Sequence, residues 1–544
     1  MILSTCHSDA EACSNGKEAE EKVQFAGKRT FSGIPFEEDS NGLGVEPPMH
    51  HPKRIKQCVQ DAIPTEEINN GYSFGEVICD ECLKLDLQGI LQEVVATRNY
   101  TIKTFGYRSR LAYNTDCPLC QIIAVSCLTA KGKHHSEELG DQEEKYEVVA
   151  VRYMGWTGLD LHYKRKPASG PVCLMLDPGG VLGPETRQGG VFFSANGGTI
   201  LRQDTIDPTL FSPQIIPRDF DPGTAKTWLD YCTKHHKRLC ASGMESVHGL
   251  QVIDCATLSV ENGRPESVYV ALSYVWAKSG GACGSIREED GKKRLPETLS
   301  AVVRDSIKVT QALGYRYLWV DKFCIDQNNP SLKHDQIQQM DAIYRNSALT
   351  IISAAGVDET YGLPGVSSRA RRQQLVIRHQ GLTVIQAPKD PQTSIASSHW
   401  STRGWTFQEA LLSRRRLVFT DDQMYFECNT MSCFESVHSP LDMLHIKDKF
   451  KTYENFRSGM FGRNRNERFG NIMREKISLN NFFCRYLSNV EDYSARNLGY
   501  DEDSLNAFRG VLGQYTKLRA RGSVSAFQLL PNGRFGEILG IGQT

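Results

Sequence analysis

The alternation of apolar and polar positions divides the chain into four parts. Residues 1–70 are polar, rich in Glu, Ser and Gly, and carry no periodic apolar positions, which is typical of a disordered tail. Residues 71–240 combine cysteine pairs with β-rich runs broken by Gly and Pro, so they predict a Cys-rich α+β region. Residues 241–435 alternate strand-like and helix-like segments. Residues 436–544 predict a mostly helical C-terminal region.

The central part has the clearest pattern. Its strand-like runs are VYVALSYVW, YLWVDKFCI, LTIISAAG and RRLVFTDDQMYFEC. Between them lie a helix that Pro296 opens and Gly314 closes, the helix-like run HDQIQQMDAIYRNS, and GWTFQEALLS after an excursion from Val357 to Trp400. Strands that alternate with helices pair in parallel through right-handed crossovers. We therefore expect a doubly wound, mostly parallel α/β sheet, flavodoxin-like in layout.

The flanking parts supply further expected elements. YEVVAVRYM and VCLMLDP predict strands, and TAKTWLDYCTKHHKRLC predicts a helix that leads into the central part. In the C-terminal part, SLNNFFCRYLSNVEDYSARNL and DSLNAFRGVLGQYTKL predict helices. The final FGEILGIGQT has no obvious closing element, so we expect a truncated or divergent terminus.

Composition limits the location and the partners. With 40% apolar and 23% charged residues the chain is typical of a soluble globular protein. Its formal net charge of −1 gives no general attraction to nucleic acid or to an anionic membrane. The N-terminus lacks the pattern of a secretory signal, and no apolar run is long enough to span a bilayer. We expect a cytoplasmic protein, and the weak basic cluster HHPKRIKQ leaves a nuclear location open.

The chain has 17 cysteines, and without an export signal these favour reduced thiols and metal ligands over disulfides. Two CxxC pairs, Cys79 with Cys82 and Cys117 with Cys120, could together bind one tetrahedral zinc. Such a four-thiolate site leaves no open position for a substrate, so its role would be structural. The alternative is a set of buried or reactive free thiols.

A second group of possible ligands lies on the helix before the central part. Cys232, His236 and Cys240 share one helix face, with His235 beside them, so two thiols and one imidazole could meet a metal. A solvated helix end with basic side chains is the simpler interpretation. We favour that interpretation and predict no metal site there.

Polar side chains follow the strand-like run YLWVDKFCI. Asp321 and Asp326 bracket its exit, with Gln327 beside them, where they could bind a ribose hydroxyl, a metal or a substrate amine. Capping of the following helix explains the same aspartates equally well. Cys324, inside the apolar run, is interpreted as a core thiol.

The segment RGWTFQE places an aromatic residue and a carboxyl at helical spacing. Trp405 precedes Glu409 by four residues, which puts the two side chains on one helix face. Burial beside an aromatic ring would raise the pKa of Glu409 and suit it to catalysis. The alternative is that Trp405 and Phe407 pack in the core while Glu409 pairs with Arg403, Arg414 or Arg415, and from these residues alone it is slightly favoured.

These motifs, in this order, resemble the HET domain of fungal heterokaryon-incompatibility proteins. The resemblance covers Tyr269 to Gly365 and Arg403 to Cys428, through LSYVW, LWVD, CIDQ, RGW and QE and the segment Met340 to Tyr344. The CxxC pairs and TWLDYC also resemble the N-terminal part common in this family. One departure is Ala277, where the family usually has Gly, and a turn that requires positive φ would be strained there.

The resemblance implies a role in non-self recognition, with growth arrest or programmed cell death when incompatible fungal cells fuse. As an interaction module the HET domain would signal by self-association. No GxxxxGK[ST] loop and no repeat of solenoid period is visible in the sequence. Recognition is therefore expected to depend on a separate incompatibility partner protein.

HET domains are also similar in layout to TIR domains, some of which cleave NAD to nicotinamide and ADP-ribose. By this comparison Glu409 would be the catalytic residue of an NAD glycohydrolase, stabilising oxocarbenium character as the glycosidic bond breaks. The substrate-binding residues would lie at the strand ends and the helix start: Ser273, Tyr274, Trp276, Asp321, Asp326, Gln327, Arg403 and Trp405. A catalytically inert, zinc-stabilised interaction scaffold is the remaining alternative.

Overall fold

The computed structural model describes the second of the two compact units into which the chain divides, Met1–Pro64 and Thr65–Thr544. The described residues are 79, 87, 89, 103–108, 117, 119, 146–152, 172–178, 199–203, 212–241, 245–277, 284–379, 382–389, 391–439, 441–443, 460–461 and 479–520. The predicted disordered tail therefore lies outside the described residues. None of the described helices combines the length and apolar character that crossing a bilayer requires.

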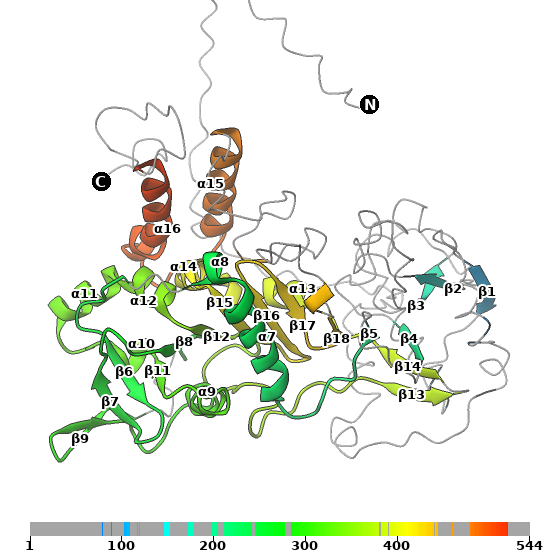
Figure 1. Cartoon of the computed structure of the whole chain (residues 1–544), viewed down its shortest axis with the longest axis horizontal. Helices are drawn as coiled ribbons and strands as arrows, with labels where there is room; N and C mark the ends of the chain where they lie inside the picture. The colour runs from blue at the N-terminus through cyan, green and yellow to red at the C-terminus, as the bar shows by residue number, and fades with distance from the viewer. Residues whose placement is uncertain are drawn as a thin grey trace, which may run out of the picture. The chain divides into compact units, whose positions relative to one another are not determined.

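A ten-stranded sheet forms the centre of the structure (Figure 1). Its order is β17-β16-β15-β12-β8-β11-β6-β7-β10-β9. The strands are β6 (Gln251–Asp254), β7 (Ser259–Asn262), β8 (Tyr269–Ser273), β9 (Arg287–Glu289), β10 (Lys292–Arg294), β11 (Tyr317–Trp319), β12 (Leu349–Ser353), β15 (Arg415–Phe419), β16 (Met424–Cys428) and β17 (Ser432–Phe434). All five residues of β8, β12, β15 and β16 are buried, including the charged side chains of Arg415, Arg416 and Glu427.

Four neighbouring strands of this sheet are parallel. β8 pairs with β11 on one side and with β12 on the other, and β12 pairs with β15. In chain order these strands are arranged 2-1-3-4, which is how the flavodoxin-like doubly wound order begins. Antiparallel strands extend the sheet at both edges, so the sheet as a whole is mixed. The predicted parallel core is present. Its strand order reverses at β8, because β11 is added on one side of β8 and β12 on the other.

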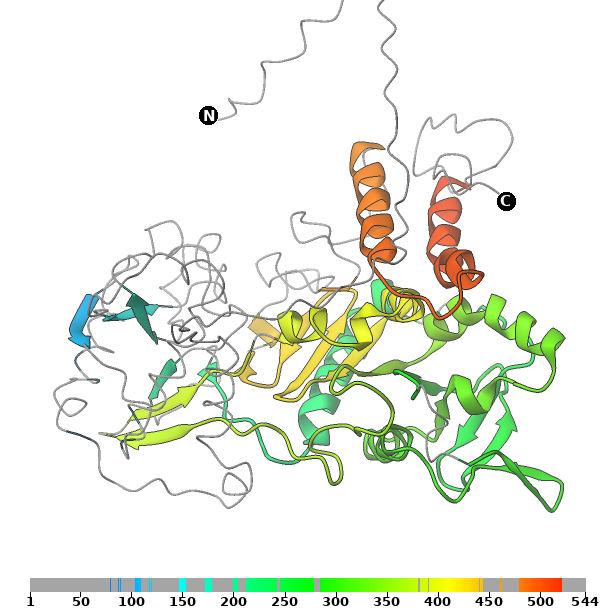
Figure 2. The ribbon, with the colours of Figure 1, turned by 180° about the vertical axis from the view of Figure 1, so that it is seen from behind.

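The crossover helices cover both faces of the parallel strands. α9 (Ala301–Ala312) lies on one side of the sheet, and α12 (Met340–Asn346) and α14 (Gly404–Leu412) lie on the other (Figures 1 and 2). This placement follows from the strand order, because the chain crosses from β8 to β11 in one direction and returns past β8 to β12 in the other. Gly314 adopts φ +87° just after α9, the left-handed conformation that a helix-closing glycine supplies.

Three expected elements differ from the prediction. The run YLWVDKFCI contains only the short strand β11, because the chain turns into the helix α10 (Asp321–Cys324). HDQIQQMDAIYRNS forms the end of α11 (Pro330–Gln338) and then α12, with a break at Gln339. RRLVFTDDQMYFEC is a hairpin of β15 and β16, because Thr420 to Gln423 form a turn whose Thr420 hydroxyl donates to the Gln423 carbonyl oxygen.

A second, six-stranded sheet joins distant parts of the sequence. Its order is β1-β2-β3-β4-β14-β13, with antiparallel pairing throughout. The strands are β1 (Lys103–Arg108), β2 (Tyr146–Arg152), β3 (Val172–Pro178), β4 (Thr199–Gln203), β13 (Val376–His379) and β14 (Leu382–Gln386). The excursion after β12 thus supplies a hairpin to the sheet that the predicted N-terminal strands build. Separately, β5 (Ser212–Pro213) pairs with β18 (Val437–His438).

The remaining elements are helical. Before the central sheet lie α7 (Pro222–His235) and α8 (Lys237–Cys240), and the ring of Trp228 on α7 lies 6.1 Å from that of Phe426 on β16. Short helices occur at α13 (Pro391–Ala396), η3 (Trp400–Thr402) and η4 (Leu441–Met443). The two predicted C-terminal helices are present as α15 (Leu479–Ser494) and α16 (Asp503–Ala520).

The C-terminal helices pack on α14 through aromatic side chains. The ring of Phe508 on α16 lies 6.0 Å from that of Phe407 on α14 and 4.7 Å from that of Tyr493 on α15. At Gly510 the contact is closer still, because an added Cβ would lie 2.4 Å from Cβ of Asp341. The helices of the C-terminal part are therefore packed directly against the element that carries Glu409.

We predict that two glycines of α16 respond to alanine in opposite directions. Gly510→Ala should destabilise the fold by about 1–3 kcal/mol, because the added methyl group overlaps the backbone-proximal atoms of α12. Gly513→Ala, whose Cβ would meet nothing within 4 Å, should stabilise it by up to about 1 kcal/mol through helix propensity. Urea unfolding of both variants measures the difference, and equal effects would contradict the packing of α16 described here.

Candidate functional site

Polar side chains gather at the carboxyl ends of the parallel strands. β8 ends at Ser273, which pairs with Ile352 of β12, and Asp321 follows β11, whose Trp319 pairs with Ala271 of β8. Because the strands run in parallel, Ser273 and Asp321 lie at the same edge of the sheet. β8 is also the strand at which the strand order reverses, with β11 on one side of it and β12 on the other. Ligands of open α/β sheets bind at such a point.

Glu409 reaches this edge from α14. Ser273 donates its hydroxyl hydrogen to Oε2 of Glu409 at 2.5 Å, and Nε1 of Trp400 donates to Oγ of Ser273 at 2.9 Å. The exposed fractions of Ser273, Trp400 and Glu409 are 0%, 1% and 5%. A serine hydroxyl has a single hydrogen, and the bond from Trp400 leaves that hydrogen to point at Glu409. The carboxyl is therefore held in one orientation beside the strand end.

Asp321 is held by a second set of donors. Its two carboxylate oxygens accept from Nε1 of Trp276 at 3.1 and 3.2 Å, and Oδ1 also accepts from the backbone N–H of Lys322 at 2.7 Å. The Lys322 ammonium lies 5.9 Å from the centre of the Trp276 ring and pairs with Glu359 at 2.9 Å. Trp276 is 36% exposed, so its ring forms the solvent-facing side of this group.

Both carboxyls bind a proton more tightly than they would in water, because both are buried. Burial, the largest effect, raises the pKa of Glu409 to about 7 and that of Asp321 to about 6. The negative charge of Asp321 raises the pKa of Glu409 further, whereas the Ser273 hydroxyl and the charge of Arg403 lower it. For Asp321 the opposing influences include the hydrogen bonds from Lys322 and Trp276. Glu409 can therefore gain or lose a proton near neutral pH, as a general acid or base requires.

Residues 269–409 match the family model described as heterokaryon incompatibility protein (HET). This segment is a HET domain. No curated protein and no solved structure matched the chain. The matched segment begins at the first residue of β8 and ends at Glu409, so the HET domain contains the whole Ser273, Asp321 and Glu409 group.

Some of the other predicted site residues contact this group, and others bond elsewhere. The side chain of Tyr274 lowers the pKa of Asp321. Gln327 donates to the backbone oxygen of Asp321 at 3.3 Å, while Asp326 accepts from the backbone N–H of Asn328 in a local turn. Trp405 donates its indole N–H to Asp503 of α16 at 3.2 Å.

Arg403 and Gly404 are fixed by the C-terminal part of the chain. The backbone N–H of Gly404 donates to Asn497 at 2.8 Å, and Asn497 donates to Thr402 at 2.6 Å. A Cβ at Gly404 would overlap the end of the Leu498 side chain, so a larger residue there requires that side chain to move. This contact positions Arg403 at the N-cap of α14, where its charge acts on both carboxyls.

Sequence reasoning missed two residues that act on Glu409. Trp400 lies at the end of the long excursion, where no periodic pattern points to a site. Tyr344 lies on α12, and its hydroxyl donates to the Leu272 carbonyl oxygen at 3.0 Å and lowers the pKa of Glu409. Ala277, where strain was expected, does not adopt a positive φ, so the departure from glycine is accommodated.

The structure also brings together one group of metal-ligating side chains in its described part. Cys232, His236, Cys240 and Cys428 are all buried, and their ligand atoms lie within 4.8 Å of one another. This Cys3His cluster could bind a metal such as zinc. The interpretation of Cys232, His236 and Cys240 as a solvated helix end is therefore wrong, because their exposed fractions are 0%, 1% and 1%. His235, beside them, is not part of the cluster.

The other proposed zinc ligands are only partly described. Cys79 is half-buried and Cys117 is buried, and Cys82 and Cys120 lie outside the described residues. The four-thiolate site of the CxxC pairs thus stays a prediction. Cys324 is fully buried, in agreement with its interpretation as a core thiol.

We predict that Glu409 makes the stability of the fold pH-dependent. Its pKa is raised from 4.5 to about 7, so its contribution is complete below about pH 4.5 and is lost as the pH rises through 7. Between these pH values the free energy of unfolding of the wild type should fall by up to about 3 kcal/mol more than that of Glu409→Gln. Ser273→Ala removes a bond that favours the carboxylate, so it should raise the pKa of Glu409 and extend the upper end of this window to higher pH. Urea unfolding from pH 4 to 9 measures both effects, and a Glu409→Gln curve parallel to the wild type would contradict the raised pKa.

Proposed function

We propose that this protein is a heterokaryon-incompatibility effector, which turns non-self recognition into programmed cell death through its HET domain. The family match of residues 269–409 supports the incompatibility role. The observation that carries the proposal further is the group of Ser273, Asp321 and Glu409 at the strand ends. A cell-death effector can act by assembly or by chemistry, and this group favours chemistry.

The environment of Glu409 is unusual for a structural carboxyl. Among the described residues no lysine or arginine forms an ion pair with it, and its oriented partner is the neutral Ser273 hydroxyl. The described contacts therefore favour a Glu409 bonded to Ser273 over one paired with Arg403, Arg414 or Arg415. Buried carboxyls with raised pKa values are frequent at catalytic positions, because catalysis near neutral pH requires them.

The chemistry that we propose is hydrolysis of the bond between nicotinamide and ribose in NAD. In this step the C1′–N bond breaks, and nicotinamide leaves with the bonding electrons and becomes neutral. Ionised Glu409 would stabilise the positive charge that develops on the ribose. Water then adds to C1′ and loses a proton, giving ADP-ribose. Asp321 would engage a ribose hydroxyl, and the exposed ring of Trp276 offers a flat surface for stacking.

This proposal keeps the analogy with TIR domains but changes one role. The analogy assigns Trp405 to the site, yet Trp405 hydrogen-bonds Asp503 of α16. The indole connected to Glu409 is that of Trp400, through Ser273. We therefore assign to Trp400 the positioning of the serine hydroxyl and to Trp276 the contact with substrate.

The enzymatic proposal predicts NAD turnover that depends on Glu409. Purified full-length protein should release nicotinamide from NAD, and Glu409→Gln should reduce the rate by at least about 100-fold, since it removes the stabilising charge. The rate should fall as the pH drops below about 7, because the ionised form of Glu409 is required. Asp305→Asn is the matched control, because this buried carboxyl accepts from the backbone N–H of Leu363 outside the group. Absence of turnover in every oligomeric state would exclude the enzyme.

The effector proposal predicts growth arrest when the protein is expressed in a fungal cell. If the chemistry is the output, Glu409→Gln should abolish the arrest while leaving protein abundance and oligomeric state unchanged. Arrest that survives in Glu409→Gln would instead identify the HET domain as a self-associating interaction module. No arrest from the wild-type chain, alone or with the incompatibility partner, would contradict the effector role.

A further inference from the structure

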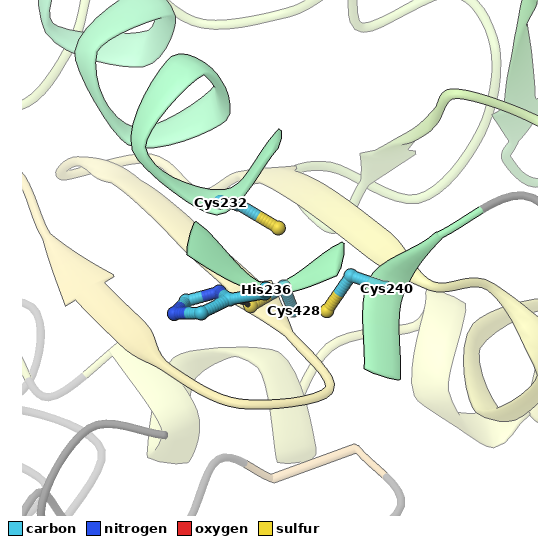
Figure 3. A group of neighbouring side chains, drawn as sticks. All are labelled: Cys232, His236, Cys240 and Cys428. Carbon is cyan, nitrogen blue, oxygen red and sulfur yellow. Dashed lines mark hydrogen bonds between the residues drawn. The ribbon is translucent and has the colours of Figure 1, made fainter. Parts of the chain in front are cut away.

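We propose that Cys232, His236, Cys240 and Cys428 bind one structural zinc ion, which joins the segments before and after the HET domain. The four side chains gather between the helical segment before the HET match and the β16 strand after it (Figure 3). This site is separate from Glu409, and the proposal does not depend on the enzymatic function.

The geometry fits a tetrahedral ion. Zn–S bonds of about 2.3 Å place the ligand atoms of a tetrahedron about 3.7 Å apart, or slightly less between sulfur and nitrogen. The Cys428 sulfur lies 3.4 Å from Nδ1 of His236, and all four ligand atoms lie within 4.8 Å of one another. The four cysteine and histidine ligands complete a zinc site and leave no position for substrate, which makes the site structural.

The surroundings provide the donors that thiolate ligands receive. The sulfur of Cys428 accepts from the backbone N–H groups of Thr430 at 3.4 Å and Met431 at 3.3 Å, in the turn that follows β16. The Thr430 hydroxyl lies 3.8 Å from the sulfur of Cys240. Such outer contacts orient metal ligands and stabilise their deprotonated form.

Arg415 supplies the most direct argument for ionised thiols. It is 8% exposed, and its Nε donates to the sulfur of Cys232 at 3.1 Å. Its other partners are the carbonyl oxygens of Ala348 and Cys240, at 3.1 and 3.0 Å. No carboxylate of the described chain lies within ion-pair distance of Arg415. A buried guanidinium needs an opposite charge, and a site of three thiolates, one neutral imidazole and Zn²⁺ carries a net charge of −1.

The order of the ligands along the chain gives the site its structural role. Cys232, His236 and Cys240 precede the HET match and Cys428 follows it, 192 residues after His236. The ion would therefore join α7 and α8 to the hairpin of β15 and β16. Without it, this junction depends on apolar contacts such as the one between Trp228 and Phe426.

Metal analysis of the full-length protein, purified under reducing conditions, tests the proposal. Cys428→Ser should lose one equivalent of zinc per chain relative to the wild type. Cys433→Ser, a buried cysteine of the neighbouring strand β17 outside the cluster, should keep it. Zinc that is unchanged in Cys428→Ser, or a wild-type chain that takes up none when zinc is supplied, would overturn the proposal.

A second measurement separates this site from the CxxC pairs and does not require Cys428→Ser to fold. Cys79→Ser disables the other candidate site and leaves the Cys3His cluster intact. After exchange of zinc for Co²⁺, Cys79→Ser should retain the visible absorption of a tetrahedral cobalt–thiolate complex. Its complete loss in Cys79→Ser would overturn the proposal and assign the metal to the CxxC pairs.

Discussion

The burial of the Glu409 carboxyl beside the end of β8 is the constraint on which the candidate site depends. Removing a carboxylate from water is unfavourable, and a second carboxyl, that of Asp321, adds repulsion. The Ser273 hydroxyl, Tyr344 and the charge of Arg403 offset only part of this, and the pKa stays near 7. An apolar side chain would fill the same space without the desolvation penalty. The presence of two such acids at the switch point of the sheet is therefore better explained by function than by stability.

The sequence was sufficient to locate those residues whose local pattern indicates the end of a strand. Ser273 and Asp321 stand at the ends of apolar runs, and alternation of strands with helices was sufficient to predict the parallel core. The length of β11 was overestimated. Periodicity cannot distinguish a continuous apolar run in a strand from the start of a helix such as α10. Trp400 and Cys428 could not be found, because their partners lie 127 and 192 residues away, and only tertiary structure brings them together.

The structural unit around the site extends beyond the matched segment on both sides. On the C-terminal side, Asn497 bonds the start of α14, and Phe508 packs on Phe407. On the N-terminal side, Trp228 of α7 contacts Phe426 of β16. A helical C-terminal region was predicted as a separate domain, yet its side chains complete the surroundings of α14. The approach at Gly404 is close, since a Cβ added there would overlap the side chain of Leu498.

These contacts explain how a short helix can hold the Glu409 carboxyl in place. α14 has nine residues, and an isolated helix of this length is marginal in water. Its N-terminus is fixed by Asn497, while at its C-terminus Ser413 donates to the Glu409 carbonyl oxygen at 2.6 Å and bonds the Thr350 hydroxyl at 2.6 Å. Arg415, two residues further, is bound to Cys232 of the Cys3His cluster. The position of Glu409 is therefore set by anchors outside the helix, and an ion at that cluster would fix the strand into which α14 leads.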